Sequence, residues 1–260
     1  MSEAEENRQR IAKVIARAGL CSRRDAEKWI LAGRVQVNNS VLTSPAFTVS
    51  NEDKIIVDGE PLPGPSKSRL WRFHKPVGLV TTHRDEKGRT NIFDALPPGL
   101  PRLVSVGRLD ITSEGLILLT NDGTLARELE HPSRGWVRRY RARVHGGVDP
   151  QSLEGLKNGV KVENVRYGPI TASLDSDPRK YSAKRNVWLS VALSEGRNRE
   201  VRKVMAHLGL TVSRLIRISY GPFQLGKLSP CGIDEVPAPV IKQQLGAAAP
   251  ISLNAKPKKT

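Results

Sequence analysis

The sequence predicts an α+β protein with a small N-terminal module and a larger mixed domain. Residues 8–60 open with two short amphipathic segments and continue as short β-type runs. Residues 69–245 alternate β-type runs with short helices, without regular βαβ repetition. Residues 61–68 are rich in Pro and Ser and are expected to form a linker. A length of 260 residues suits one medium domain with a smaller companion.

Helix signals are clear in the N-terminal module. Apolar residues recur at helical spacing over residues 11–18, and Gly19 follows where a helix would end. Ser22 stands three residues before Asp25, a capping arrangement that predicts a second helix ending at Gly33. Short strands are expected at 34–37, 41–43 and 54–57.

The second domain shows several short strands separated by helices. We expect helices near 123–130, 151–157 and 199–208, and a disordered basic tail over 246–260. We expect strands near 70–73, 103–106, 115–120, 137–145, 169–174, 187–194 and 211–219.

Charge points to the class of partner. The formal net charge is +16, and basic charge favours polyanions by releasing the counterions condensed on phosphates. Nucleic acid is therefore expected, although charge alone does not separate DNA from RNA. No apolar run of about 18 residues exists and the first ten residues carry no apolar signal region, so a cytoplasmic protein without membrane contact is expected. Cys21 and Cys231 stand far apart, which argues against a disulfide framework and a zinc site.

Basic residues are concentrated on the two N-terminal helices, where few acidic residues oppose them. A solvated helix face is the ordinary explanation. The surplus on so small a module favours RNA binding instead. The residues singled out are Lys13, Arg23, Arg24 and Arg34.

The most informative segment places Arg108 and Asp110 in a short polar turn before an apolar β run that ends in Asn121-Asp122-Gly123. Such a layout suits a carboxylate held at the edge of a cleft by a buried strand. The ordinary alternative is a surface aspartate that pairs with Arg108.

Four segments together resemble a known family. Residues 107–123 are similar to the active-site motif of the bacterial pseudouridine synthases that modify small- and large-subunit rRNA. Lys75-Pro76-Val77-Gly78 resembles the family's first motif, which is mostly structural, and residues 194–203 resemble its third. Residues 8–60 resemble the S4 RNA-binding domain. The resemblance covers residues 8–240 and implies a catalytic domain with a mixed, mostly antiparallel sheet.

The resemblance also implies roles for single residues. Asp110 would be the nucleophile, Arg202 its basic partner, and Tyr140 the aromatic that stacks on the target base and assists removal of the C5 proton. Arg108 would occupy the space that the flipped base vacates. Leu215 would pack against the uracil, although a plain core leucine is as good an interpretation, and Tyr140 could equally be cross-strand packing.

Further basic residues would contact the RNA backbone. Arg138 and Arg139 flank Tyr140 on an arginine-dense strand. Arg199 and Lys203 are expected to share a face with Arg202 on a helix capped by Asn198. All four are predicted to bind phosphates.

Within the family, the resemblance is strongest to the enzymes that modify large-subunit rRNA. It implies isomerisation of one uridine in 23S rRNA, in naked rRNA or in an assembly intermediate of the large ribosomal subunit, by a monomer without cofactor or metal. The alternatives are a small-subunit rRNA pseudouridine synthase and a non-catalytic RNA-binding factor of ribosome assembly.

Overall fold

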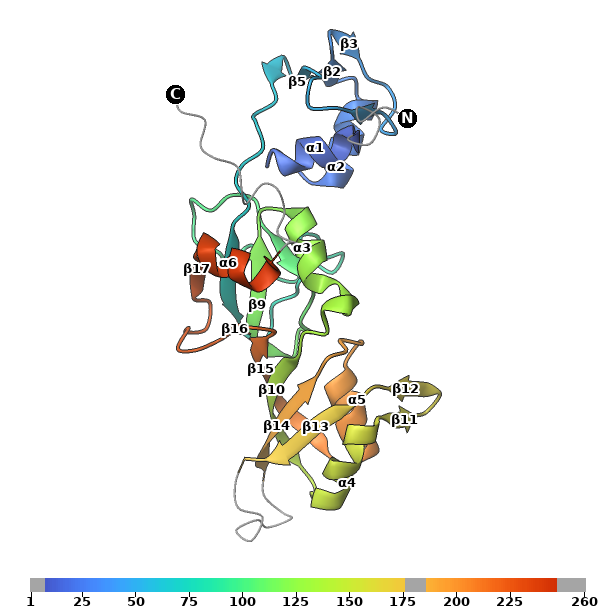
Figure 1. Ribbon diagram of the computed structural model, residues 1–260, viewed down its shortest axis with the longest axis vertical. Coiled ribbons are helices and arrows are strands. Elements are labelled where there is room, and N and C mark those ends of the chain that lie inside the picture. The colour runs from blue at the N-terminus through green and yellow to red at the C-terminus, as the bar shows by residue number, and fades with distance from the viewer. Residues whose placement is uncertain (1–7, 176–185, 247–260) are drawn as a thin grey trace.

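The computed structural model describes residues 8–175 and 186–246, and the N-terminal module lies at one end of it (Figure 1). Except for Gly246, the tail predicted to be disordered lies outside the described residues. No helix in the described part of the chain is long and apolar enough to cross a membrane.

The N-terminal module packs two helices, α1 (Ile11–Arg17) and α2 (Arg23–Leu31), beside a small sheet. The predicted cap of α2 is present, because the Ser22 hydroxyl accepts the Asp25 backbone N–H at 3.0 Å. The expected strand at 41–43 was misplaced, since β3 ends at Val41. The module's strands are β1 (Gln9–Arg10), β2 (Val35–Val37), β3 (Ser40–Val41), β4 (Thr48–Val49), β5 (Ile55–Val57) and β6 (Glu60–Pro61).

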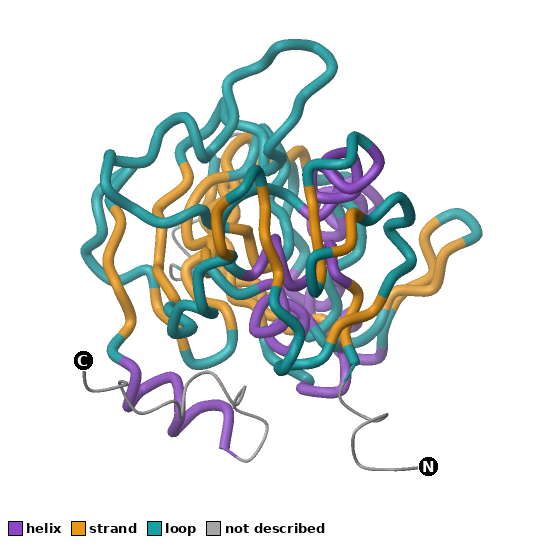
Figure 2. The backbone as a smooth tube through the Cα atoms, turned by 90° about the horizontal axis from the view of Figure 1, so that it is seen from above, coloured by secondary structure: helices purple, strands orange, loops and turns teal. Residues whose placement is uncertain are grey.

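A nine-stranded sheet forms the second part of the chain, in the order β13-β14-β10-β15-β9-β7-β17, with β8 on β9 and β16 on β15. In the described residues β9 and β15 run parallel and the other pairs run antiparallel, so the predicted mixed, mostly antiparallel sheet is confirmed. The strands gather in the middle of the molecule, with long loops outside them (Figure 2). Their bounds are β7 (Leu70–Lys75), β8 (Val104–Val106), β9 (Glu114–Thr120), β10 (Arg138–His145), β13 (Ile170–Leu174), β14 (Val187–Leu193), β15 (Thr211–Tyr220), β16 (Phe223–Gln224) and β17 (Ile233–Val236).

Helices cover the sheet unevenly. On one face, α4 (Pro150–Gly155) and α5 (Glu200–His207) pack on β10, β13 and β14 in one apolar cluster. On the other face, α3 (Gly123–Glu130) and α6 (Ala238–Leu245) pack on β7 and β9 in a second cluster. Strand β9 lies between the two clusters, which explains its unbroken apolar run. A hairpin of β11 (Val160–Val162) and β12 (Val165–Tyr167) and 3-10 turns at Pro132–Arg134 and Leu156–Asn158 complete the domain.

The turn after β9 fastens the end of the linker to the second domain. The Asn121 side-chain amide donates to the Lys67 carbonyl at 2.9 Å, and its oxygen accepts the Arg69 N–H at 2.8 Å. Asp122 then caps α3 by accepting the Thr124 N–H at 2.8 Å. The Asn-Asp-Gly segment therefore joins three elements through backbone groups.

Gly115 is the point where β9 and β15 come closest. Its φ is +105°, and a Cβ there would lie 2.7 Å from the Arg217 backbone nitrogen. Both the backbone conformation and the space exclude a larger residue. The parallel pairing of β9 with β15 thus depends on this glycine.

We expect Gly115→Ala to lower the free energy of unfolding by roughly 2–5 kcal/mol, because it adds a backbone clash to a strained conformation. Urea unfolding followed by circular dichroism measures the change. Gly123→Ala is the matched control, since Gly123 has ordinary φ and nothing within 4 Å of a Cβ. Equal midpoints for the two variants would show that β9 and β15 separate at little cost.

Candidate active site

A cavity of about 530 Å³ opens on the α5 side of the sheet, where β10 and β15 meet the turn before β9. This volume is typical of a pocket that holds a small organic group such as a nucleoside. It brings together residues from six separate stretches of the sequence: 80–89, 107–113, 130, 138–140, 193–201 and 215–220. Of the residues predicted for function, it is lined by Arg108, Asp110, Arg138, Tyr140, Arg199 and Leu215.

Asp110 lies in a turn whose backbone is held from several sides. The Leu109 carbonyl accepts the Thr81 hydroxyl at 2.8 Å, and the Ile111 carbonyl accepts the Gly78 N–H at 2.8 Å. The Asp110 carbonyl accepts the Ser113 N–H at 3.0 Å, which closes the turn. The side chain is half-buried and reaches the cavity. A carboxylate is thus fixed at the cavity wall by contacts to its backbone.

Arg202 helps to hold this turn through carbonyl oxygens. Its guanidinium donates to the Thr112 carbonyl at 2.9 Å and to the Val212 carbonyl at 2.7 Å. Among the described residues it forms no ion pair with Asp110, and it does not line the cavity. Burial lowers the pKa of Arg202, and the nearby Asp110 charge opposes that shift. Arg202 therefore links α5 and β15 to the turn that carries Asp110.

Lys75 is a fully buried cation at the end of β7. Its ammonium group donates to the Ser113 carbonyl at 2.8 Å and to the Pro76 carbonyl at 3.0 Å. Burial lowers the pKa of Lys75 to about 8, against the opposing effect of the Asp110 and Glu114 charges. The lysine of the first motif is thus a second anchor of the Asp110 turn, in agreement with the structural role expected for that motif.

Arg217 is a site residue that the sequence did not reveal. It is 3% exposed, its Nε donates to the Leu116 carbonyl at 2.7 Å, and its side chain lines the cavity. Its Nη2 is buried and has no partner among the described residues. A buried donor without a partner costs free energy unless a ligand satisfies it. The available signal was its spacing, two residues after Leu215 on the same strand face.

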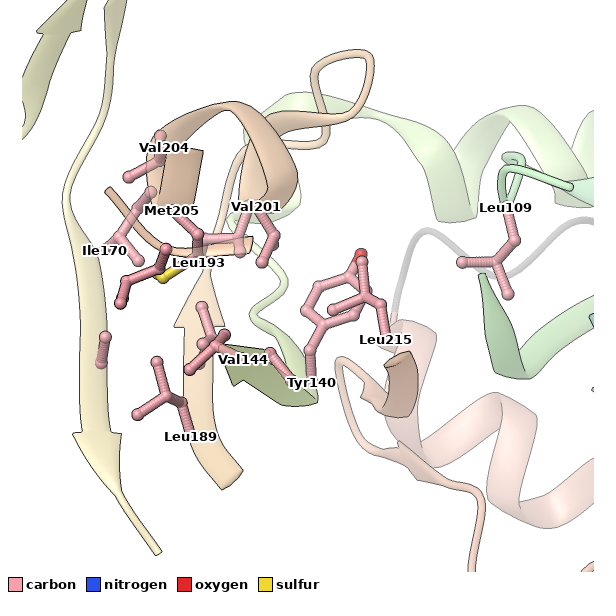
Figure 3. Close-up of a cluster of buried hydrophobic side chains, with 14 of the residues drawn as sticks. Leu109, Tyr140, Val144, Ile170, Leu189, Leu193, Val201, Val204, Met205 and Leu215 are labelled. Carbon is pink, nitrogen blue, oxygen red and sulfur yellow. The ribbon is translucent and has the colours of Figure 1, made fainter. Parts of the chain in front are cut away.

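Tyr140 and Leu215 form the apolar wall of the cavity. Both are at most 9% exposed, and they belong to one apolar cluster that also contains Val201 (Figure 3). Each also lines the cavity, so packing and ligand contact are compatible. A planar base could lie against this wall.

The rim of the cavity is rich in arginine. Arg108 and Arg199 are exposed at it, and Arg108 forms no ion pair with Asp110 in the residues that the structure describes. Lys203 is exposed but does not line the cavity. The rim therefore presents positive charge around a carboxylate.

The helix start at this rim differs from the prediction. Helix α5 begins at Glu200, and Arg199 is the N-cap with φ of +53°, so a cap by Asn198 was wrong. The Glu200 carboxylate instead accepts the Arg197 N–H at 2.9 Å. Burial raises the pKa of Glu200 to about 7, and the neighbouring Glu195 carboxylate acts in the same direction. The left-handed backbone of Arg199 marks the boundary of the helix.

The two arginines beside Tyr140 lie on opposite faces of the sheet. Arg138 lines the cavity, and its guanidinium donates to the Ser194 carbonyl at 2.5 Å and the Glu195 carbonyl at 3.2 Å. Arg139 is exposed and does not line the cavity. The alternation of side chains along a strand explains this difference, and phosphate binding by both arginines stays a prediction.

The basic residues of the N-terminal module are distributed over its surface. Arg24 is exposed, while Lys13 and Arg23 are half-buried. Burial lowers the pKa of Lys13. Arg34 is engaged within the module, because its Nε donates to Asp58 at 2.7 Å and its guanidinium lies 4.5 Å from the centre of the Trp29 ring. In the described part of the chain no cluster of His, Cys, Asp and Glu could hold a metal ion.

Known proteins resemble this chain over most of its length. Residues 69–207 match the RNA pseudouridylate synthase family, and residues 9–55 match the S4 domain. An RNA pseudouridine synthase of Rickettsia bellii, itself uncharacterized, is 47% identical over 88% of this chain and 96% of that protein. The ribosomal large subunit pseudouridine synthase B of Pseudomonas aeruginosa is 43% identical over 82% of this chain, which spans 55% of that protein.

A solved structure has the same fold. The crystal structure of a pseudouridylate synthase aligns with a TM-score of 0.63 over 92% of this chain and 99% of that chain, at 24% identity. The sequence identity to the two relatives named above, 47% and 43%, is well above the 24% identity to this solved structure. With its S4 domain and its synthase domain, the chain belongs to the RNA pseudouridylate synthase family, the isomerases that convert uridine to pseudouridine in RNA.

Proposed function

We propose that this chain converts one uridine of 23S rRNA to pseudouridine, with Asp110 as the nucleophile. The single observation that carries the proposal is the cavity that joins the Asp110 carboxylate to the wall of Tyr140 and Leu215. The large-subunit target rests on likeness to the pseudouridine synthase B proteins of Pseudomonas aeruginosa and Salmonella typhi. The likeness to these enzymes also favours rRNA over other RNAs as the substrate. We propose that the protein acts on the rRNA as a monomer.

The isomerisation requires few catalytic side chains. The N1–C1′ bond breaks, the uracil turns, and a C5–C1′ bond forms while C5 loses a proton and N1 gains one. An ionised Asp110 can add to the substrate, and Tyr140 lies in the same cavity with a hydroxyl that can assist the proton transfer. Arg217 also lines this cavity and adds a positive charge to its wall.

The base must leave its stack to reach Asp110. Flipping a nucleotide costs on the order of a few kcal/mol, and contact with the wall of Tyr140 and Leu215 offsets part of this cost. The exposed Arg108 can fill the space that the base leaves, and Arg199 can bind a phosphate at the rim. We propose that residues 8–60, the S4-like module, and residues 69–245, the catalytic domain, bind the RNA together.

A purely RNA-holding role is less consistent with these contacts. Binding a polyanion does not call for a carboxylate at the centre of a basic rim, because that carboxylate repels phosphate. Here the backbone around the carboxylate is held by Lys75, Thr81 and Arg202. Such fixation is expected of a reacting group.

We expect Asp110→Asn to reduce pseudouridine formation at least about a thousandfold, since the neutral amide is no nucleophile. Its affinity for rRNA should stay within about twofold of wild type. Tritium release from transcripts labelled at uridine C5 measures turnover, and filter binding measures affinity. Asp234→Asn, at an exposed residue of β17, is the matched control. An equal loss of binding in Asp110→Asn would make Asp110 a structural residue.

The target follows from a map of rRNA pseudouridines by carbodiimide modification and primer extension. We expect one stop in 23S rRNA to disappear in cells that lack the protein. It should return with the wild-type protein and stay absent with Asp110→Asn. A lost stop in small-subunit rRNA would establish the alternative substrate, and an unchanged map would exclude rRNA modification.

The buried Lys75 predicts a pH dependence of stability. Its pKa of about 8 in the folded protein lies below the ordinary value of 10.5, so the folded state binds fewer protons than the unfolded state between these values. The cost of burying the charge is therefore complete below pH 8 and fades as the pH rises toward 10.5. Urea unfolding of wild type and Lys75→Met at about pH 7.5 and about pH 9.5 should show that wild type gains relative to the variant at the higher pH. An equal change in the free energy of unfolding with pH for both proteins would contradict the burial of a charged Lys75.

A further inference from the structure

The face of the sheet opposite the cavity carries a second group of arginines. Along β10, Tyr140, Ala142 and Val144 are buried toward the cavity side, and the residues between them are exposed. The α3 and α6 helices cover this opposite face over β7 and β9, but over β10 its residues remain exposed. Over β14, Ser190 is exposed and Trp188 and Ala192 are half-buried. We call its exposed arginines, Arg139, Arg141, Arg143 and Arg214, the outer basic face.

Strand register brings two of these cations into direct opposition. Arg143 on β10 pairs with Arg214 on β15 and with Trp188 on β14. Like charges placed directly opposite on neighbouring strands destabilise a sheet. The ion pair of Arg214 with Glu114 offsets part of this repulsion, and a bound anion would offset the rest.

Aromatic contacts and acidic partners fix part of the group. The guanidinium of Arg141 lies 4.8 Å from the centre of the Trp188 ring, and that of Arg214 lies 6.0 Å from it. Arg141 also pairs with Asp175 at 2.9 Å, and Arg214 pairs with Glu114. These two arginines are thereby held in place beside the indole.

The remaining two arginines are open to a partner. Within residues 8–175 and 186–246, neither Arg139 nor Arg143 has a carboxylate at ion-pair distance. Exposed hydroxyls of Thr171 and Ser173 lie on β13, two strands from β10, while the Ser190 hydroxyl on β14 donates to Asp175 at 2.5 Å. Guanidinium groups with hydroxyls nearby are the side chains that contact a phosphate backbone.

We propose that the outer basic face binds the phosphate backbone of the substrate RNA, at a segment outside the one that enters the cavity. The partner is RNA because this family acts on RNA and because four arginines face only two carboxylates in this described part of the surface. The inference concerns affinity and adds to the proposed function, since the sheet separates this face from the Asp110 cavity. A long RNA can pass around the edge of the sheet and contact both faces, whereas a short one cannot.

The test uses the full-length protein and the double variant Arg139→Gln/Arg143→Gln. Two RNAs serve as probes, a full-length 23S rRNA transcript and a short single strand of about nine nucleotides that contains uridine. Filter binding from about 50 to about 300 mM salt gives the affinity and its salt dependence. The charge-matched control is Lys227→Gln/Lys242→Gln, at two exposed residues elsewhere on the surface.

We expect the double variant to bind the transcript about tenfold more weakly at about 100 mM salt and to lower its salt slope by about 1.4 to 1.8, which corresponds to two lost phosphate contacts. Binding of the short strand should be unchanged, and Arg139→Lys/Arg143→Lys should keep the wild-type slope. Wild-type binding of the transcript by the double variant would overturn the inference. An equal loss in the lysine control, or an equal loss for the short strand, would overturn it as well.

The inference and the proposed function fail in different ways. Pseudouridine formation by the wild-type protein is read by tritium release, independently of the binding curves. If the wild-type enzyme is active and the double variant binds the transcript normally, only the proposal for the outer basic face is overturned. If the wild-type protein forms no pseudouridine, the proposed function is contradicted, whatever the binding curves show.

Discussion

The site depends on one constraint, the fixation of the turn that carries Asp110 through its own carbonyl oxygens. The carbonyls of residues 109 to 113 accept hydrogen bonds from Thr81, the Gly78 and Ser113 N–H groups, Arg202 and Lys75. These donors come from the end of β7, the loop after it, the turn itself and α5. Because the backbone takes these bonds, the Asp110 carboxylate is left at the cavity wall. The reactive group is thus oriented by contacts that do not use its charge.

The same turn leads directly into the parallel contact of β9 with β15. Gly115 permits the two backbones to approach, and Arg217 on β15 reaches across to the Leu116 carbonyl of β9. Leu215 and Arg217 therefore keep a fixed distance from the Asp110 turn. Strand pairing of this kind places groups more accurately than a loop does. Any change that separates β9 from β15 should disturb the carboxylate and the base-facing wall together.

The sequence predicted most strands of the large sheet but not the β11–β12 hairpin, β17 or α6. It predicted side-chain directions less well. Helix and strand limits follow from periodicity, as for α3 or β10, and the S4 resemblance was confirmed. The opposite directions of Arg138 and Arg139 follow from the alternation of side chains along a strand. The carbonyl contacts of Arg202 and the open donor of Arg217 were not predictable, because they depend on which strands become neighbours.

Lys75 and Arg217 are two buried cations near Asp110 that lower the stability of the fold and serve the site. Lys75 and Arg217 are each at most 3% exposed, and burying a charge costs several kcal/mol unless it is well paired. Their partners here are neutral carbonyls, which satisfy some donors and do not neutralise the charge. A more stable protein would place apolar residues at both positions. Besides holding backbone carbonyls, both cations add positive potential around Asp110, where an anionic nucleotide must approach an anionic carboxylate.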